Sequence, residues 1–115
     1  VEVMGQIPAM FAMQWRLPDF DRYDLSSLKL ILFGGQQVTT AFLDQLRQMC
    51  PNVMTGLGLT EMAGFCTYTS LDDDQATLST RVGKAMPVTP LSIRRPMKED
   101  GSAGEELPPG EAGEI

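Results

Sequence analysis

The sequence predicts an α/β fold, in which part of a parallel-sheet subdomain is followed by a β-rich segment. Two apolar runs, at residues 28–33 and 53–54, each lead into a glycine turn, and a helix-like pattern lies between them. This order of strand, glycine turn, helix, strand and glycine turn is typical of a parallel sheet. Open α/β sheets bind ligands beyond the carboxyl ends of their strands, where both glycine turns fall.

The first helix is expected to begin near Pro8 and to end before Pro18, because proline fits a first helical turn but not a helix interior. Three apolar residues recur there at helical spacing: Met10, Met13 and Leu17. They predict a helix face directed at the core, with Trp15 adding to the packing. The acidic and aromatic residues 19–24 indicate a solvated connector.

A strand, a helix and a second strand are expected next. The run 28–33 is nearly all apolar, which suits a strand buried in a parallel sheet. Thr39 or Thr40 can cap the following helix, and Pro51 ends it. The apolar residues of that helix are Phe42, Leu43, Leu46 and Met49. Residues 53–54 then begin the second strand.

The later residues differ in character, so we divide the chain into an α/β portion at 1–70 and a β-rich, distorted barrel-like portion at 71–115. Asp72–Asp74 and the Thr/Ser residues after them are expected to form a loop, and consecutive carboxylates of this kind usually stay hydrated. Strands are expected at 91–94 and 111–115, with a hairpin turn at Asp100-Gly101.

Composition excludes several classes of function. The net charge of −6 argues against nucleic-acid binding, which needs clustered Lys and Arg. No run of about eighteen apolar residues is present for a membrane span. The chain has no histidine, so zinc sites and Cys–His nucleophiles are not expected. Cys50 and Cys66 favour two small buried thiols over a disulfide, which suits a cytoplasmic protein; a peripheral membrane association of a longer parent stays open.

The segment Thr55–Glu61 is the strongest candidate for a functional site. Its glycines let the backbone approach a ligand closely, and the Thr60 hydroxyl can donate to a phosphate oxygen. The Glu61 carboxylate can ligate a hard cation such as Mg²⁺. The structural alternative is a simple turn in which Glu61 lies near a helix start, a common use of carboxylates.

Six short motifs, in order along the whole chain, resemble the AMP-forming acyl-CoA synthetases of the adenylate-forming superfamily. They are Ile7–Met10, Asp24–Leu28, Gly34–Gln36, Gly58–Glu61, Val82–Pro87 and Gly110–Ile115. Enzymes of this family are several times longer than 115 residues, so the resemblance implies an internal fragment of one.

The resemblance implies a role for each motif residue. A nucleotide is expected along Gly34, Gly35, Gln36, Leu57, Gly58, Leu59 and Thr60. Thr60 would donate to the α-phosphate of ATP, and Glu61 would bind magnesium; these two are the expected catalytic residues. Leu57 departs from the family, which usually carries an aromatic residue there, so ATP affinity or base selectivity is expected to differ.

The acyl pocket is expected around Met62, Gly64 and Phe65, although ordinary core packing explains these residues equally well. Lys84 does not match the surroundings of the family's catalytic lysine. The last two motifs are structural in the family.

The implied activity is that of a carboxylate–CoA ligase. The parent would use ATP and Mg²⁺ to adenylate a carboxylic acid, with a fatty acid favoured, and coenzyme A would then take the acyl group. The fragment alone is expected to be inactive, because a phosphate loop and a C-terminal lysine-bearing domain lie outside it in the family. Two alternatives remain: adenylation of an aryl or amino acid, and a non-catalytic α/β binding or scaffold module.

Overall fold

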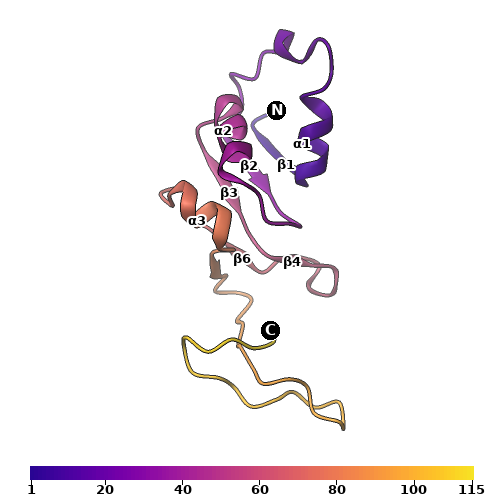
Figure 1. The fold of residues 1–115 in the computed structure, drawn as a ribbon, viewed down its shortest axis with the longest axis vertical. Coiled ribbons are helices and arrows are strands. Elements are labelled where there is room, and N and C mark those ends of the chain that lie inside the picture. Colours follow the sequence, from indigo (N-terminus) through magenta and orange to yellow (C-terminus); the bar gives the residue numbers. More distant parts are fainter. The chain divides into compact units, whose positions relative to one another are not determined.

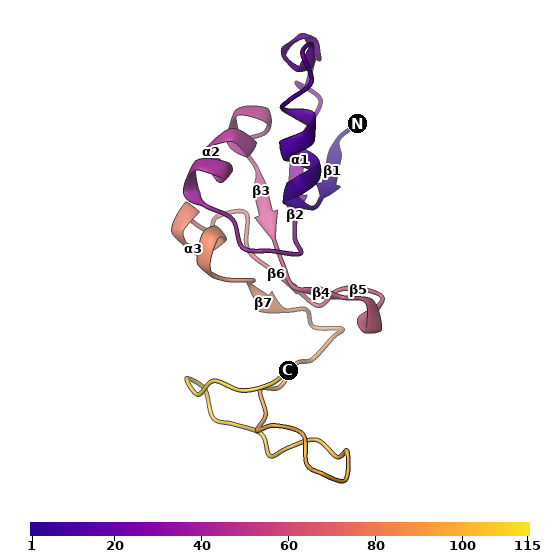
Figure 2. The ribbon, with the colours of Figure 1, turned by 45° about the vertical axis from the view of Figure 1, so that its right-hand side comes forward.

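The computed structural model describes all 115 residues, which form two compact units, residues 1–84 and 85–115. The first unit contains a three-stranded sheet in the order β1-β2-β3, with both strand pairs parallel. Its strands are β1 (Val3–Gln6), β2 (Leu30–Phe33) and β3 (Val53–Thr55), drawn in Figures 1 and 2. The predicted α/β class is therefore confirmed, and no closed barrel is present.

The strand register aligns the carboxyl ends of the three strands. Gln6 lies opposite Phe33, and Phe33 lies opposite Thr55. The segments that leave the three strands therefore begin at one edge. The sequence did not reveal β1, because its four residues include a glycine and lack a clear alternation of apolar and polar side chains.

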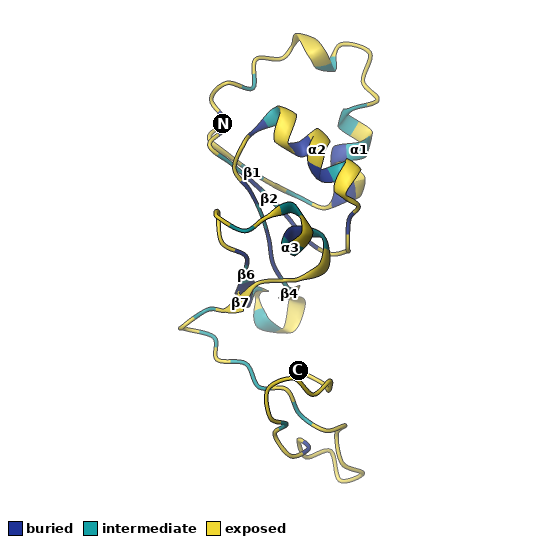
Figure 3. Cartoon of the chain, turned by 60° about the vertical axis from the view of Figure 1, so that its left-hand side comes forward, coloured by how far each residue is buried: buried dark blue, intermediate teal, exposed yellow.

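Two helices pack against the sheet: α1 (Pro8–Gln14) and α2 (Thr40–Met49). The Thr39 hydroxyl accepts a hydrogen bond from the Phe42 amide at 3.3 Å, which confirms the expected cap of α2. Helix α2 ends just before Cys50 and Pro51, as expected. Buried residues lie on the helices and on the strands that these cover (Figure 3). Their side chains form one core cluster, which includes Phe11, Ile31, Phe33, Leu43, Leu46 and Val53.

The predicted core face of α1 was wrong. Met10, Met13 and Leu17 are exposed, with 69% of Met13 accessible, whereas Phe11 is fully buried. Helix α1 ends at Gln14, so Leu17 does not belong to it. Phe11 packs against the Trp15 ring, with 6.2 Å between ring centroids. Phe11 belongs to the core cluster and Trp15 packs against it, so these two side chains define the core face of α1. Large aromatic surfaces bury more area than methionines at competing positions.

A third helix replaces the loop expected after the aspartates. Helix α3 (Gln75–Thr80) begins where the Asp74 carboxylate accepts a hydrogen bond from the Thr77 amide at 2.7 Å. That backbone hydrogen bond is the main reason that the pKa of Asp74 lies below its ordinary value. The composition of 75–80 is poor for a helix, so burial of Leu78 and the cap decide its structure.

The first unit also holds short elements around the glycine segments. They are the 3₁₀ turns Phe20–Arg22 and Thr60–Met62, and the strands β4 (Gly58–Leu59), β5 (Gly64–Phe65) and β6 (Thr67–Tyr68). Strand β7 (Lys84–Ala85) spans the boundary between the two units. Strand β4 pairs with β5 in antiparallel fashion. None of the α-helices has the length and apolar character needed to cross a lipid bilayer.

The second unit is a loop structure held by isolated bridges. The strands expected at 91–94 and 111–115 reduce to bridges from Arg94 to Glu106 and to Glu114. The expected turn is present, because the Gly101 amide donates to the Lys98 carbonyl at 2.9 Å with a φ of 81° at the glycine. Three prolines in residues 96–109 cannot donate to a strand ladder, which limits the pairing.

We expect Phe11→Ala to lower the free energy of unfolding by about 3–5 kcal/mol, because it empties a fully enclosed site. Met13→Ala should cost less than about 1 kcal/mol, because that side chain is mostly in solvent. Urea unfolding of both variants measures the difference. Equal losses would restore the original assignment of the core face.

Candidate functional site

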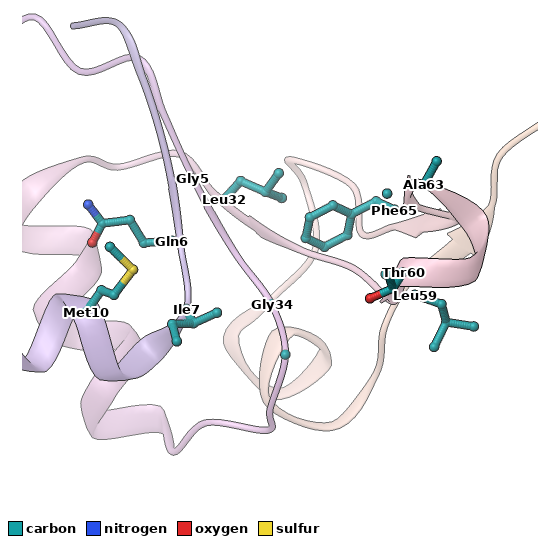
Figure 4. Close-up of a pocket in the computed structure, with 13 residues that line it drawn as sticks. Gly5, Gln6, Ile7, Met10, Leu32, Gly34, Leu59, Thr60, Ala63 and Phe65 are labelled. Atoms are coloured by element: carbon teal, nitrogen blue, oxygen red, sulfur yellow. The ribbon is translucent and has the colours of Figure 1, made fainter.

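A groove of about 670 Å³ opens at the carboxyl edge of the sheet; we call it the first groove (Figure 4). Its walls carry six apolar side chains: Ile7, Met10, Leu32, Leu59, Ala63 and Phe65. In Figure 4, Leu32 extends toward Phe65, whereas Gln6 and Met10 lie at the opposite end. Glycine backbone, Gln6 and Thr60 supply the remaining lining. A groove of this character suits a largely apolar ligand with one polar end.

A second groove of about 450 Å³ lies beside the other face of the glycine segments. Its lining is richer in polar groups, with Gln36, Gln37 and the end of α3 at residues 79–82. Leu57 adds an apolar surface, and Arg81 is its only charged residue. This groove offers hydrogen-bonding groups together with backbone that a flat ligand can approach.

The two grooves share three residues: Gly35, Gly58 and Leu59. These residues therefore belong to the walls of both grooves. Thr60 directly follows Gly58 and Leu59 in the chain and lines the first groove.

The glycines at this junction are also required by packing. A Cβ on Gly56 would lie 2.1 Å from the Thr67 carbonyl oxygen, and one on Gly34 would lie 2.8 Å from Cζ of Phe65. Gly35 has a φ of 92°, in the left-handed region that glycine adopts readily. The turn interpretation and the ligand interpretation of these residues are therefore compatible.

Buried threonines hold the glycine segment in place. The Leu57 amide donates to the Thr67 hydroxyl at 2.8 Å, and that hydroxyl donates to the Val82 carbonyl. The Thr55 amide donates to the Thr69 hydroxyl at 2.9 Å. These bonds satisfy backbone groups that would otherwise be unpaired next to the groove.

Glu61 differs from the other predicted residues. It lies in the exposed 3₁₀ turn Thr60–Met62, forms no ion pair and lines neither groove. Ala63 follows in the left-handed conformation with a φ of 56°. A single exposed carboxylate fits magnesium, because that ion usually takes one or two protein carboxylates and fills its other positions with phosphate oxygens and water.

The structure brings most of the predicted site residues together. The first groove takes Gly34, Gly35, Gly58, Leu59, Thr60, Gly64 and Phe65. The second takes Gly35, Gln36, Leu57, Gly58 and Leu59. Met62, like Glu61, lines neither.

Sequence reasoning missed the contributions of residues 5–6, as well as Gln37 and residues 79–82. Most of these residues were missed because they lie at the ends of elements that the sequence analysis did not predict. Residues 5–6 end the unrecognised strand β1, and residues 79–80 end the unrecognised helix α3. The available signal was the Asp74 cap, with threonine three residues later.

A family model described as AMP-binding enzyme matches residues 1–115, the whole chain. The chain belongs to this family. The predicted resemblance to AMP-forming acyl-CoA synthetases is thereby confirmed at the level of the family.

Named relatives agree with this assignment. The chain is 33% identical over 113 residues to 3-[(3aS,4S,7aS)-7a-methyl-1,5-dioxo-octahydro-1H-inden-4-yl]propanoyl:CoA ligase of Rhodococcus jostii (strain RHA1), covering 96% of this chain and 20% of the relative. Amide bond synthetase McbA from Marinactinospora thermotolerans superposes with a TM-score of 0.73 at 26% identity, covering 98% and 22% of the two chains. The luciferase-like enzyme from the Zophobas morio mealworm gives 0.70 at 28% identity, covering 98% and 26%. The chain thus spans about a fifth of the length of the curated relatives that it matches.

We expect Thr67→Val to destabilise the first unit, because it leaves the Leu57 amide and the Val82 carbonyl without partners. Each unpaired buried group costs about 1–3 kcal/mol. Thr80→Val is the control, since its hydroxyl bonds only an exposed helix carbonyl, that of Ala76. Urea unfolding compares the two, and equal stability would show that the Thr67 hydroxyl does not hold the glycine segment.

Proposed function

We propose that this chain is the central part of an AMP-forming carboxylate–CoA ligase. The parent enzyme adenylates a carboxylic acid, with a fatty acid as the first candidate, and then transfers the acyl group to coenzyme A. One observation carries the proposal: two grooves of different chemistry meet at Gly35, Gly58 and Leu59. An adenylating enzyme must hold an acid and a nucleotide in that relationship.

The second groove is assigned to ATP. Gly35 and Gln36 offer backbone along which the flat adenine ring lies, and Leu57 covers the ring by dispersion. Gly34, the neighbour of Gly35, lines the first groove instead. The groove needs no basic patch for this task, because backbone amides and Thr60 contact the phosphate region. That assignment is consistent with the acidic charge of the chain.

The first groove is assigned to the acid. Its apolar walls suit an alkyl chain, and Phe65 lies against Gly34, next to the residues shared by both grooves. The carboxylate then points toward those residues, where the α-phosphate lies. Gly64 lines this groove and Met62 does not, so the proposed acyl pocket uses Gly64 and Phe65.

The chemistry follows from this placement. A carboxylate oxygen attacks the α-phosphorus of ATP, the new P–O bond forms and the bond to the leaving pyrophosphate breaks. The thiolate of coenzyme A then attacks the acyl carbon, and AMP leaves with the former carboxylate oxygen. Thr60 donates a hydrogen bond to an α-phosphate oxygen, where negative charge increases in the transition state. Glu61 would hold Mg²⁺, which neutralises phosphate charge when bound.

The remaining parts of the enzyme are proposed from the family. A C-terminal lysine-bearing domain and an upstream phosphate loop would complete the site, so the isolated 115 residues should not form an acyl-adenylate. A cytoplasmic location suits the two free buried cysteines.

A ring-bearing acid is the second candidate substrate. The relative from Rhodococcus jostii is named for a propanoyl group attached to a bicyclic dione. The first groove, at about 670 Å³, has the volume that ligands of this size occupy.

The decisive experiment is acid-dependent exchange of pyrophosphate into ATP by the full-length enzyme, with short, long and ring-bearing acids. We expect Thr60→Val and Glu61→Gln each to lower the exchange rate by a factor of roughly 10²–10³, the usual effect of losing one transition-state contact. Glu99→Gln is the control, because Glu99 is exposed and lies outside both grooves.

Pyrophosphate exchange that requires an acid and is lost in both variants supports adenylation. The acid on which the exchange depends identifies the substrate class. A folded wild-type enzyme with Mg²⁺ that exchanges pyrophosphate with none of the acids would favour the binding or scaffold module instead. Unchanged exchange in Thr60→Val or Glu61→Gln would contradict the role given to that residue.

A further inference from the structure

Arg81 is the only charged residue that lines the second groove. It directly follows α3, is exposed, and takes part in neither of the two ion pairs of the structure. The pKa of the Asp74 carboxyl group is lowered chiefly by the hydrogen bond from the Thr77 amide, and less by the positive charge of Arg81. The guanidinium is therefore not committed to a structural role in this unit.

Hydrogen bonds link the segment that carries Arg81 to the segment that carries Leu57. The Thr67 hydroxyl bonds both the Leu57 amide and the Val82 carbonyl, so the backbone after Arg81 is linked to Leu57 through one side chain. A second link joins the end of α3 to the loop after β2, since Gln37 Nε2 donates to the Ser79 carbonyl at 2.8 Å. Leu57, Arg81 and Gln37 therefore line the second groove from segments that are bonded to one another.

We propose that Arg81 binds the adenine base of ATP by stacking its planar guanidinium on the ring. This inference rests on the proposed function, in which the second groove holds the nucleotide. Leu57 offers the ring an aliphatic surface without a π face, whereas a guanidinium both stacks on aromatic planes and is attracted to their π electrons. Arg81 thus supplies the directional contact that Leu57 lacks.

The position of Arg81 favours the base over the phosphates. Thr60, the phosphate donor of the proposed mechanism, lines the first groove and not the second. The phosphates therefore lie near the residues common to both grooves, Gly58 and Leu59. Arg81 lines only the second groove, together with Leu57, the residue assigned to the adenine ring.

The test uses the full-length ligase and measures KM for ATP in acid-dependent pyrophosphate exchange. Arg81→Met, which keeps the side-chain length but removes the planar cation, should raise KM for ATP roughly tenfold, with KM for the acid unchanged. Arg81→Lys should raise KM for ATP less than Arg81→Met does, without restoring the wild-type value, because a lysine ammonium keeps the attraction to π electrons but not the planar face. Arg22→Met is the matched control, an exposed arginine outside both grooves.

A double variant distinguishes a loss of stacking from a general loss of structure. Leu57→Tyr supplies a π face of its own, so in that background Arg81→Met should raise KM for ATP by less than about threefold. Thermal melting of the Arg81 variants should remain at the wild-type midpoint, because the Arg81 side chain is exposed and forms no ion pair.

The outcomes are distinct. A wild-type KM for ATP in Arg81→Met overturns the stacking proposal. A wild-type KM in Arg81→Lys, with a raised KM in Arg81→Met, also overturns it, because that result would indicate a charge contact with phosphate. Exchange that is absent in the wild type with every acid overturns the proposed function itself. Loss of ATP affinity in both Arg81 variants, reduced by Leu57→Tyr, is the result that we expect.

Discussion

The parallel register of β1, β2 and β3 places Gln6, Phe33 and Thr55 in one row, and the position of the site depends on that row. Three chain segments leave the sheet at the same edge as a result. Two of them begin with a glycine, so backbone without side chains lies where the strands end. Because backbone amides and carbonyls there are not all used by the sheet, this edge is available for ligands.

Hydrogen bonds of the buried threonines hold the segments at that edge in place. Thr55, Thr67 and Thr69 are each at most 5% exposed, and their hydroxyls bond backbone groups on neighbouring segments. Valine has nearly the same shape but would leave those groups unpaired at a cost. Polar side chains inside this unit thus hold Leu57 and the residue after Arg81 in place, and both segments line the second groove.

Glycine serves packing and binding at the same positions. The space next to Gly56 is filled by the Thr67 carbonyl, and the space next to Gly34 is filled by the Phe65 ring. A side chain at either position would displace those groups and close the junction between the grooves. Structural necessity and ligand access therefore act together here, and a substitution at these glycines would disturb both.

The sequence by itself determined the α/β class, strands β2 and β3, the cap of α2, the turn at Gly101 and the cluster of glycines at the site. Each of these depends on local chemistry: continuous apolar runs, a threonine cap, or a backbone angle that glycine adopts readily. The tertiary structure alone decided that Phe11 rather than Met13 faces the core, and that residues 75–80 form a helix whose end lines the second groove. Competing faces of a short helix are separated by the area that each buries, and a weak helix is stabilised by its cap and by the burial of Leu78. The area that each helix face buries and the burial of Leu78 both depend on contacts between segments that are distant in the sequence, so local patterns do not predict them.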